Sequence, residues 1–454
     1  MRVAFALWPN PVHLYPMVPL AWALRAAGHE VYVASHPALA ETAAASGLRF
    51  VPVCDEAAMP VPMGPGNAYV EDRAKVERIT EALRIPDGDR DRWNIFSQFL
   101  LPSMWDFNAY QGSADLPAMD GLVAFFEDWQ PDLVIWDPCF AGAGVAARVV
   151  GARHARFTGP DIVGWSLDTF EELTGRPGAP VLDNPLAETV RPMAEKYGVP
   201  VDRETLLGQW TLNPMPAAMN WPVETTMVPV RWIPHANAES IPDWLYPVPE
   251  RPRVALSLGL SMRSYMATGW DYVAVLLEAL GGLDVEVIAT LNEKQLAGVS
   301  RVPDNVRVVD YVPLDQLMPT CSALIHHGGF GTTIAATTSR VPQLIVDFLD
   351  ESVTAVAAEG GVAATRYVVA PNSVGFIARH GAGEVVNLSR PSVDTIRAQV
   401  RRVLTDESYQ RGASGLYDEL LATPSPTDIV GLVEKLARPA EPARVTRRIT
   451  DRAA

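Results

Sequence analysis

Short apolar runs alternate with segments of helical periodicity along the first half of the chain. Runs of strand length occupy residues 3–7, 30–35, 132–136, 154–157 and 230–235, and apolar residues recur at helical spacing in 16–27, 122–129, 140–150 and 185–197. Apolar strands that alternate with helices are typical of parallel sheets, which are covered on both faces. The first half of the chain therefore predicts an α/β domain built on a parallel sheet.

The same alternation restarts after a proline-rich segment. Residues 241–252 contain four prolines in twelve positions, a composition typical of a linker. Beyond it the pattern predicts strands at 253–258, 285–290, 306–309, 323–326 and 342–346, and helices at 270–280, 315–318, 332–339, 391–404, 409–421 and 426–437. We therefore predict two Rossmann-like α/β domains, residues 1–238 and 253–437, that face each other across a cleft. Residues 239–252 form the predicted linker, and residues 438–454 form a charged, proline-containing tail that we expect to be disordered.

The regular pattern weakens between residues 59 and 115. This segment has Pro-Gly turns, a charged stretch and scattered aromatic residues, namely Trp93, Phe96, Phe99, Trp105, Phe107 and Tyr110. Long connections of this kind often carry function. The segment is compatible with the wall of an acceptor pocket, with a docking face for a partner, or with a helical excursion that has its own small core.

Two polar side chains follow strands of the first predicted sheet. His13 lies in the loop after residues 3–7, and Asp137 comes directly after residues 132–136. The carboxyl ends of parallel strands meet at one edge of the sheet, where ligands bind, so both side chains should face the same crevice. A histidine there can act as a base at neutral pH, although it can also be a surface residue or one that holds a loop carbonyl. Asp137 can orient that base, take the proton itself or cap the next helix.

A glycine turn follows another predicted strand. Residues 323–333 read Ala-Leu-Ile-His-His-Gly-Gly-Phe-Gly-Thr-Thr, so an apolar strand stops at two histidines and a glycine turn before a helix begins. Glycines let the backbone approach a ligand closely, and the first amides of a helix bind anions. The spacing fits neither the G-x-G-x-x-G dinucleotide fingerprint nor a P-loop. A buried structural turn is the alternative, which is disfavoured because paired histidines are costly in a plain core.

Composition and charge limit the class of ligand. The chain has 454 residues, of which 48% are hydrophobic and 20% charged, and 37 basic against 53 acidic residues give a net charge of −16. This charge argues against a general binder of nucleic acid or anionic membrane, so any phosphate contact must be local. Three dispersed cysteines, without metal-binding spacing, indicate a reduced cytoplasmic compartment and no structural metal. No apolar stretch reaches the length of a membrane span, and we find no targeting signal.

The glycine turn, with Val341-Pro342-Gln343 and Asp350-Glu351, resembles the donor-binding motif of family 1 glycosyltransferases. The likeness is greatest to actinomycete enzymes that transfer deoxysugars to macrolides and anthracyclines, and it extends over nearly the whole chain. It implies the GT-B fold and transfer of a deoxysugar from a nucleoside diphosphate, with dTDP expected, to a hydroxyl of a polyketide-type aglycone. An inverting displacement without a covalent intermediate is the simpler mechanism, and it requires no metal. No cofactor is expected, since the nucleotide sugar is a co-substrate.

The resemblance also assigns roles to particular residues. It implies that His13 is the base and that His326 contacts the donor phosphate. The predicted donor site is completed by the glycine turn, by two acids that would bind sugar hydroxyls, and by the turn after strand 253–258; its members are Gly328, Gly329, Phe330, Gly331, Thr332, Asp350, Glu351, Ser257, Gly259 and Ser261. Family members commonly have an aromatic residue before the first acid and glutamine after it, where this chain has Leu349 and Glu351.

Partners and alternatives complete the interpretation. Several of the antibiotic glycosyltransferases are activated by a helper that resembles a cytochrome P450 without its haem, so a helper of this kind is expected here. A homodimer is a separate expectation. A Rossmann-type NAD(P) oxidoreductase is disfavoured, because residues 1–35 lack the glycine fingerprint and an acid after the second strand. A catalytically silent homologue that binds a partner or product is the third hypothesis.

Overall fold

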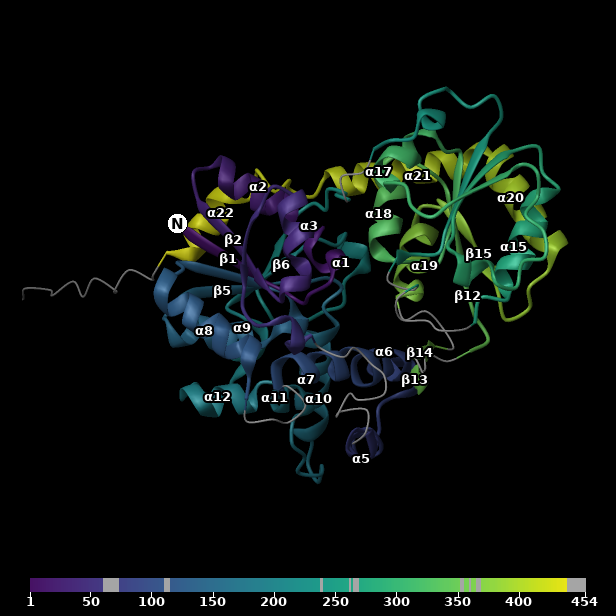
Figure 1. The fold of residues 1–454 in the computed structure, drawn as a ribbon. Coiled ribbons are helices and arrows are strands. Elements are labelled where there is room, and N and C mark those ends of the chain that lie inside the picture. Colours follow the sequence, from purple (N-terminus) through teal and green to yellow (C-terminus); the bar gives the residue numbers. More distant parts are fainter. Residues whose placement is uncertain are drawn as a thin grey trace, which may run out of the picture.

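The computed structural model describes residues 1–59, 73–109, 115–236, 240–260, 263, 269–351, 355–358, 361–364 and 369–438. The predicted donor residue Ser261 and nearly all of the predicted tail lie outside the described residues. The chain forms two parallel sheets, each covered by helices in a lobe of its own (Figure 1). The prediction of two Rossmann-like α/β domains is confirmed.

The first lobe is built on seven parallel strands in the order β3-β2-β1-β4-β5-β6-β7. The strands are β1 (Arg2–Ala6), β2 (Glu30–Ser35), β3 (Arg49–Pro52), β4 (Leu133–Trp136), β5 (Arg153–Phe157), β6 (Trp210–Asn213) and β7 (Met227–Pro229). The prediction of a last strand at 230–235 was wrong. Pro229 precedes this segment and Pro234 lies within it. The Val230 amide still donates to the Asn213 carbonyl of β6 at 2.9 Å, but the Arg231 amide donates to the carbonyl of Pro424 at 2.7 Å, so the segment leaves the sheet after its first residue.

Helices cover both faces of this sheet. They are α1 (Pro11–Leu14), α2 (Val18–Ala26), η1 (Pro37–Leu39), α3 (Ala40–Ala45), η2 (Glu56–Ala58), α5 (Arg73–Leu83), η3 (Asp87–Asp89), α6 (Arg90–Ile95), the π-helix η4 (Phe96–Leu100), α7 (Leu101–Ala109), α8 (Pro117–Trp129), η6 (Pro138–Phe140), α9 (Gly142–Val149), α10 (Ile162–Thr174), α11 (Pro185–Glu188), α12 (Arg191–Tyr197), α13 (Arg203–Leu207) and η7 (Ala217–Met219). The helix predicted at 185–197 is thus divided, and Pro192 stands in the first turn of its second part, where proline fits.

The second lobe is built on six parallel strands in the order β10-β9-β8-β11-β12-β15. The strands are β8 (Arg253–Ser257), β9 (Glu286–Thr290), β10 (Val306–Val309), β11 (Ala323–His326), β12 (Gln343–Asp347) and β15 (Gly383–Asn387), and β13 (Ala355–Ala358) pairs with β14 (Gly361–Ala364) in a separate hairpin. The helices are η8 (Asp243–Leu245), α15 (Tyr272–Gly281), α16 (Glu293–Leu296), α17 (Leu314–Leu317), η9 (Met318–Thr320), α18 (Phe330–Thr338), α19 (Ala370–Arg379), α20 (Val393–Thr405), α21 (Glu407–Leu421) and α22 (Val430–Ala437).

The strand order reverses once in each sheet, between β1 and β4 in the first and between β8 and β11 in the second. In open α/β sheets, ligands bind beyond the carboxyl ends of the strands at such a reversal. His13 follows β1 and Asp137 follows β4, whereas the turn at Gly259 follows β8 and the glycine turn follows β11. The fold therefore brings each pair of sequence-predicted segments to one point.

Two segments do not pack where their position in the sequence would place them. Helix α22 returns to the first lobe, where it lies near α2 (Figure 1) and buries Val430 and Val433 in the core of the seven-stranded sheet. His29 Nε2 lies 3.0 Å from the Glu434 carboxylate across this contact. Conversely, Leu245 of the proline-rich segment is buried in the core of the second lobe. The two lobes are thus tied together by both the linker and the end of the chain.

The aromatic segment forms the helices α5 to α7. Trp93 and Phe96 are buried in the core of the first lobe, and no large apolar side chain described between residues 76 and 105 is exposed. Arg92 stacks between the rings of Trp165 and Trp221, 4.6 and 4.5 Å from their centroids, and so fixes α6 to the body of the lobe. The described part of the segment therefore lacks the exposed apolar face that the docking interpretation requires.

Candidate active site

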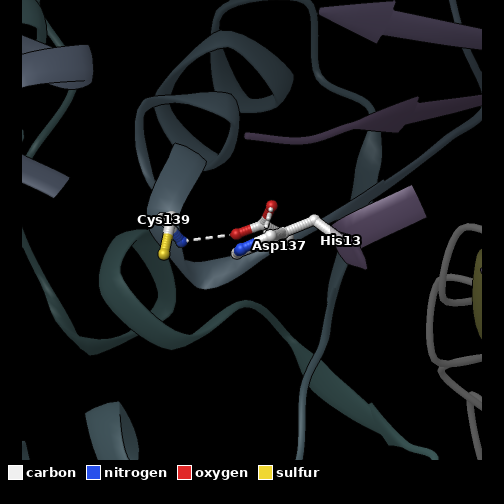
Figure 2. A group of neighbouring side chains, drawn as sticks. All are labelled: His13, Asp137 and Cys139. Carbon is white, nitrogen blue, oxygen red and sulfur yellow. Dashed lines mark hydrogen bonds and ion pairs between the residues drawn. The ribbon is translucent and has the colours of Figure 1, made fainter. Parts of the chain in front are cut away.

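A histidine–aspartate pair lies at the reversal point of the first sheet (Figure 2). His13 is on the one-turn helix α1, whose start is capped by Asn10, and its Nδ1 lies 3.0 Å from Asp137 Oδ2. The His13 side chain is 28% exposed and the Asp137 side chain 4%. The pair therefore has a buried carboxylate on one side of the imidazole, while the ring borders a cavity.

The carboxylate is fixed by the backbone as well. Its Oδ2 accepts the amide of Trp8 at 2.7 Å, and its Oδ1 accepts the amide of Cys139 at 2.6 Å, which caps η6. Both the capping and the orienting interpretations of Asp137 are thus met by one side chain. Because both oxygens already accept hydrogen bonds, Asp137 is better placed to orient His13 than to take a proton from a substrate.

His13, Asp137 and Cys139 each offer one donor atom, and these atoms lie within 4.8 Å of one another (Figure 2). Burial, with the Asp137 charge and hydrogen bond, raises the pKa of the Cys139 thiol well above its usual value. A neutral thiol is a poor metal ligand, and the carboxylate is occupied by backbone amides. The group therefore fits an oriented base better than a metal centre.

An apolar cavity of about 250 Å³ lies beside His13. Ile95, Phe99 and Leu100, from α6 and the π-helix, form one wall, and Trp221 adds an aromatic face. Of the three interpretations of the aromatic segment, the structure favours the pocket wall, since Phe99 and Leu100 contribute directly to it. π-Helical turns often occur at functional sites.

The opposite wall is held by a buried ion pair. The segment from Thr158 to Pro160 lines the cavity, and Asp161 follows it at the start of α10. Arg156 donates to both Asp161 oxygens, to the Leu207 carbonyl and to the Thr211 hydroxyl, and the Arg156 and Asp161 side chains are 0% exposed. This network fixes the cavity wall relative to strands β5 and β6.

A second cavity of about 280 Å³ lies at the reversal point of the second sheet. Its wall includes His327, Gly259 and the first turn of α18, from Gly329 to Thr332. The cap residue Gly329 has no side chain to satisfy the first amides of α18, so these amides remain suited to an anion. Val12, Trp232 and Phe330 line both cavities, which therefore adjoin across the cleft.

His326, which the resemblance assigned to the donor phosphate, does not reach this cavity. It is the last residue of β11, paired with Ser257 of β8 and Ile345 of β12, and its side chain is 0% exposed. Its Nδ1 accepts the amide of Gly328 at 3.2 Å, which supports the glycine turn. The residue that lines the cavity is the next one, His327, because it stands beyond the last ladder position of the strand.

Both histidines are neutral at physiological pH. Burial lowers the pKa of His326 to about 3, with His327 adding to the effect and Gln343 opposing it. Burial lowers the pKa of His327 to about 4, with a hydrogen bond to the Ser257 backbone opposing it. In the protein without a ligand, His327 is therefore uncharged and can offer a hydrogen bond to a phosphate.

Two glycines enclose the ring of His327. A Cβ on Gly259 would lie 2.3 Å from its Cε1, and a Cβ on Gly329 would lie 2.4 Å from its Nε2. Gly259 also has a φ of +82°, which disfavours any side chain. These contacts require glycine at both positions, whereas the sequence pattern indicated only a turn there.

We expect Gly329→Ala to displace His327 and to weaken nucleotide binding at least about tenfold, because the new methyl group would overlap the ring. Gly331→Ala is the matched control: the same cavity accepts its methyl group at 3.7 Å from Trp232, an ordinary contact. Titration calorimetry with dTDP measures both variants. Equal affinities for the two variants would contradict this account of His327.

The two acids of the predicted sugar site lie away from both cavities. Asp350 Oδ2 pairs with Arg390 Nε at 2.8 Å, and Glu351 is exposed. Neither contributes to either cavity wall, whereas Ser257 and Gly259 line the second cavity as predicted. The structure thus brings Ser257, Gly259 and residues 329–332 together around the second cavity, whereas His326, Gly328, Asp350 and Glu351 line neither cavity.

Three further residues of the cavities were absent from the sequence prediction. Trp232 was placed in a strand, His327 was passed over in favour of its neighbour, and Arg263 had no motif around it. The end of strand β11 could have indicated His327, since a side chain within the ladder of a central strand points at a covering helix layer. Trp232 and Arg263 depend on contacts between distant segments and left no local signal.

Two facing Rossmann-like domains, with adjoining cavities at their reversal points, are the architecture of a GT-B glycosyltransferase. The chain belongs to the family described as Erythromycin biosynthesis protein CIII-like, whose N-terminal and C-terminal domain models match residues 22–259 and 274–436. The resemblance recognised in the sequence is therefore confirmed, and the protein is a glycosyltransferase.

Individual relatives agree with this assignment. Aclacinomycin-T 2-deoxy-L-fucose transferase of Streptomyces galilaeus is 38% identical over 96% of this chain and 96% of its own length. 3-alpha-mycarosylerythronolide B desosaminyl transferase of Saccharopolyspora erythraea is 37% identical over 96% of this chain and 98% of its own. The structure of the glycosyltransferase VinC in complex with dTDP aligns with a TM-score of 0.75 and 34% identity, over 96% of this chain and 99% of VinC. These relatives give no support to the oxidoreductase hypothesis.

No helix in the described part of the chain is long and apolar enough to cross a bilayer.

Proposed function

We propose that this protein transfers a deoxysugar from a dTDP-activated donor to a hydroxyl group of a polyketide-type aglycone, with inversion at the anomeric carbon. The observation that carries the proposal is the position of His13. Its imidazole is held by Asp137 at the edge of an apolar cavity, and that cavity shares Val12, Trp232 and Phe330 with the cavity of the glycine turn. The names of the relatives, which include transferases for deoxysugars, support the choice of donor.

In the proposed reaction, His13 is the general base. With Nδ1–H donated to Asp137, Nε2 is the nitrogen left to accept the proton of the acceptor hydroxyl. The hydroxyl oxygen then bonds to the anomeric carbon as the bond to the diphosphate oxygen breaks. The charge that develops on the leaving diphosphate is stabilised by His327 and by the first amides of α18.

The acceptor is proposed to be an apolar ring system. Apart from the His13–Asp137 pair, the lining of the first cavity is almost entirely aliphatic or aromatic. Such a surface recognises its ligand by buried apolar area and leaves the few polar groups to orient the reacting hydroxyl. This favours a macrolactone or a polycyclic aromatic aglycone over a free sugar or a peptide.

The test is a transfer assay with mass spectrometry. The protein is incubated with a panel of dTDP-deoxysugars and with macrolactone and anthracyclinone-type aglycones, and His13→Ala serves as the control. We expect an aglycone mass increased by one deoxysugar residue and a stoichiometric release of dTDP. Thermal stabilisation by NADP but not by dTDP would instead favour the oxidoreductase, and binding of dTDP without any product over the whole panel would favour the silent homologue.

We expect His327→Ala to weaken dTDP binding by about 1.5–3 kcal/mol, the usual contribution of a hydrogen bond to a charged group. His326→Asn is the matched control, because its amide oxygen can accept the Gly328 amide as the imidazole does. Titration calorimetry should show near wild-type affinity for the control. A larger loss for His326→Asn than for His327→Ala would return the phosphate contact to His326.

The sugar contacts of Asp350 and Glu351 stay a proposal based on the family motif. A P450-like helper, a homodimer and a cytoplasmic location likewise stay part of the proposal. The helper and the homodimer rest on the same resemblance, and the location rests on three unbridged cysteines.

An activator can act only through a higher affinity for the competent conformation of the cleft. We expect a co-expressed helper to raise the rate of the purified protein without adding a catalytic residue. Full activity of the isolated chain at nanomolar concentration, unchanged by co-expression, would remove the helper from the proposal.

A further inference from the structure

One charged side chain of the second cavity, that of Arg263, has no role in the reaction proposed above. Among the described residues that line this cavity, Arg263 is the only one with a positive charge, whereas Asp310 and Asp315 are acidic. His327 is neutral, and the chain as a whole carries a net charge of −16. Among the described residues, Arg263 is therefore the cationic side chain that a diphosphate entering this cavity would meet.

The guanidinium group is held in place by two strand ends. Its Nη2 donates to the carbonyls of Thr290 and Asp310, each at 2.8 Å, and its Nη1 donates to Asp310 Oδ1 at 3.0 Å. The side chain is 11% exposed, and its buried Nε has no hydrogen-bond partner. Arg263 is thus anchored on one edge and retains an unsatisfied donor, an arrangement that is costly in the absence of a ligand.

The counter-ion inside the protein is weak. The Asp310 side chain is 77% exposed, so water screens its charge, and it balances the buried guanidinium only in part. Burial lowers the pKa of Arg263, with Asp310 opposing the shift, which reflects the same cost. A dianionic ligand would offset that cost through its charge and through the guanidinium N–H groups that Thr290 and Asp310 leave free.

We infer that Arg263 binds the diphosphate of the donor, opposite the first turn of α18. Thr290 ends β9 and Asp310 follows β10, whereas α18 follows β11 on the other side of β8. The diphosphate would then lie between a fixed cation on one side and the helix amides with His327 on the other. This inference rests on the proposed nucleotide donor and adds the residue that supplies the positive charge.

The experiment is a calorimetric titration of the full-length protein with dTDP and with thymidine at two salt concentrations. For Arg263→Gln we expect dTDP binding to weaken at least about tenfold, with thymidine binding unchanged and a smaller dependence of dTDP affinity on salt. Arg263→Lys, which keeps the charge but loses the planar guanidinium and its contacts to both strand ends, should fall between wild type and Arg263→Gln. Arg301→Gln is the matched control: it removes the same charge from an exposed pair with Asp304 that lines neither cavity, so dTDP affinity should stay close to that of the wild type.

Two results would overturn the inference. One is wild-type dTDP affinity in Arg263→Gln. The other is a parallel loss of dTDP and thymidine binding in Arg263→Gln, which would show that Arg263 only supports its segment. Absence of dTDP binding by the wild-type protein would overturn the donor assignment together with this inference. If the wild-type protein binds dTDP but forms no product, the result counts against the transfer reaction alone. Failure of the proposed function and failure of this inference are therefore distinguishable.

Discussion

His13→Ala should lower turnover by about 10²- to 10⁴-fold and leave dTDP affinity unchanged, since this is the usual contribution of a general base. The imidazole lines the acceptor cavity and is absent from the lining of the donor cavity. Its loss therefore removes proton transfer without removing a nucleotide contact. Steady-state kinetics with saturating donor, together with calorimetry for dTDP, measures the two effects separately.

Asp137→Asn is the companion variant. Asparagine retains one oxygen to accept a backbone amide but cannot balance the imidazolium that forms when His13 takes the proton. Turnover should fall by less than in His13→Ala, and the double variant should be no slower than His13→Ala alone, because the two residues act as a unit. Turnover of His13→Ala within a few-fold of wild type would show that another group, with Asp137 the first candidate, takes the proton.

Asp161→Ala should lower the free energy of unfolding by about 3–5 kcal/mol, the cost of leaving one partner of a buried ion pair uncompensated. Arg156 would keep its bonds to the Leu207 carbonyl and the Thr211 hydroxyl but would lose the two contacts to the carboxylate. The amide of Gly164 in the first turn of α10 would lose its cap as well. Urea unfolding of the intact chain measures the change.

Glu172→Ala is the control on the same helix. Its partner Arg176 is more than half exposed, as is Glu172 itself, and such a pair contributes at most about 1 kcal/mol. The Asp161 variant should also lose acceptor turnover before it unfolds, because the wall from Thr158 to Pro160 adjoins the pair. A change below about 1 kcal/mol in Asp161→Ala would mean that Arg156 finds another partner or reaches water.

The sequence by itself determined the class of fold. Apolar runs within 3–7, 132–136 and 323–326 became central strands, because a strand that is buried on both faces needs apolar side chains on both. The amphipathic segments became the covering helices, because their apolar faces pack on the sheet and their polar faces meet water. Strands β3, β6 and β15 were not predicted, because they are short and lack a distinct periodic signal.

The sequence also indicated where chemistry would lie. His13, Asp137 and the glycine turn all follow predicted strands, and parallel strands place their carboxyl ends at one edge. The predicted strand end at 326 could also have indicated which of the two adjacent histidines lines the cavity. That depends on where the ladder with β8 and β12 ends, and it ends at His326.

Only the tertiary structure decided the remaining contacts. Trp232 lines both cavities because the chain leaves the sheet after Val230. Arg263 lines the second cavity because the ends of β9 and β10 present carbonyls to its guanidinium. Helix α22 returns to the first lobe because its apolar face fits the core beside β1 and not the sheet that precedes it in sequence. Each of these contacts joins segments that are far apart along the chain. Hydrophobic periodicity reports whether a side chain is buried, but it carries no information about which distant segment buries it.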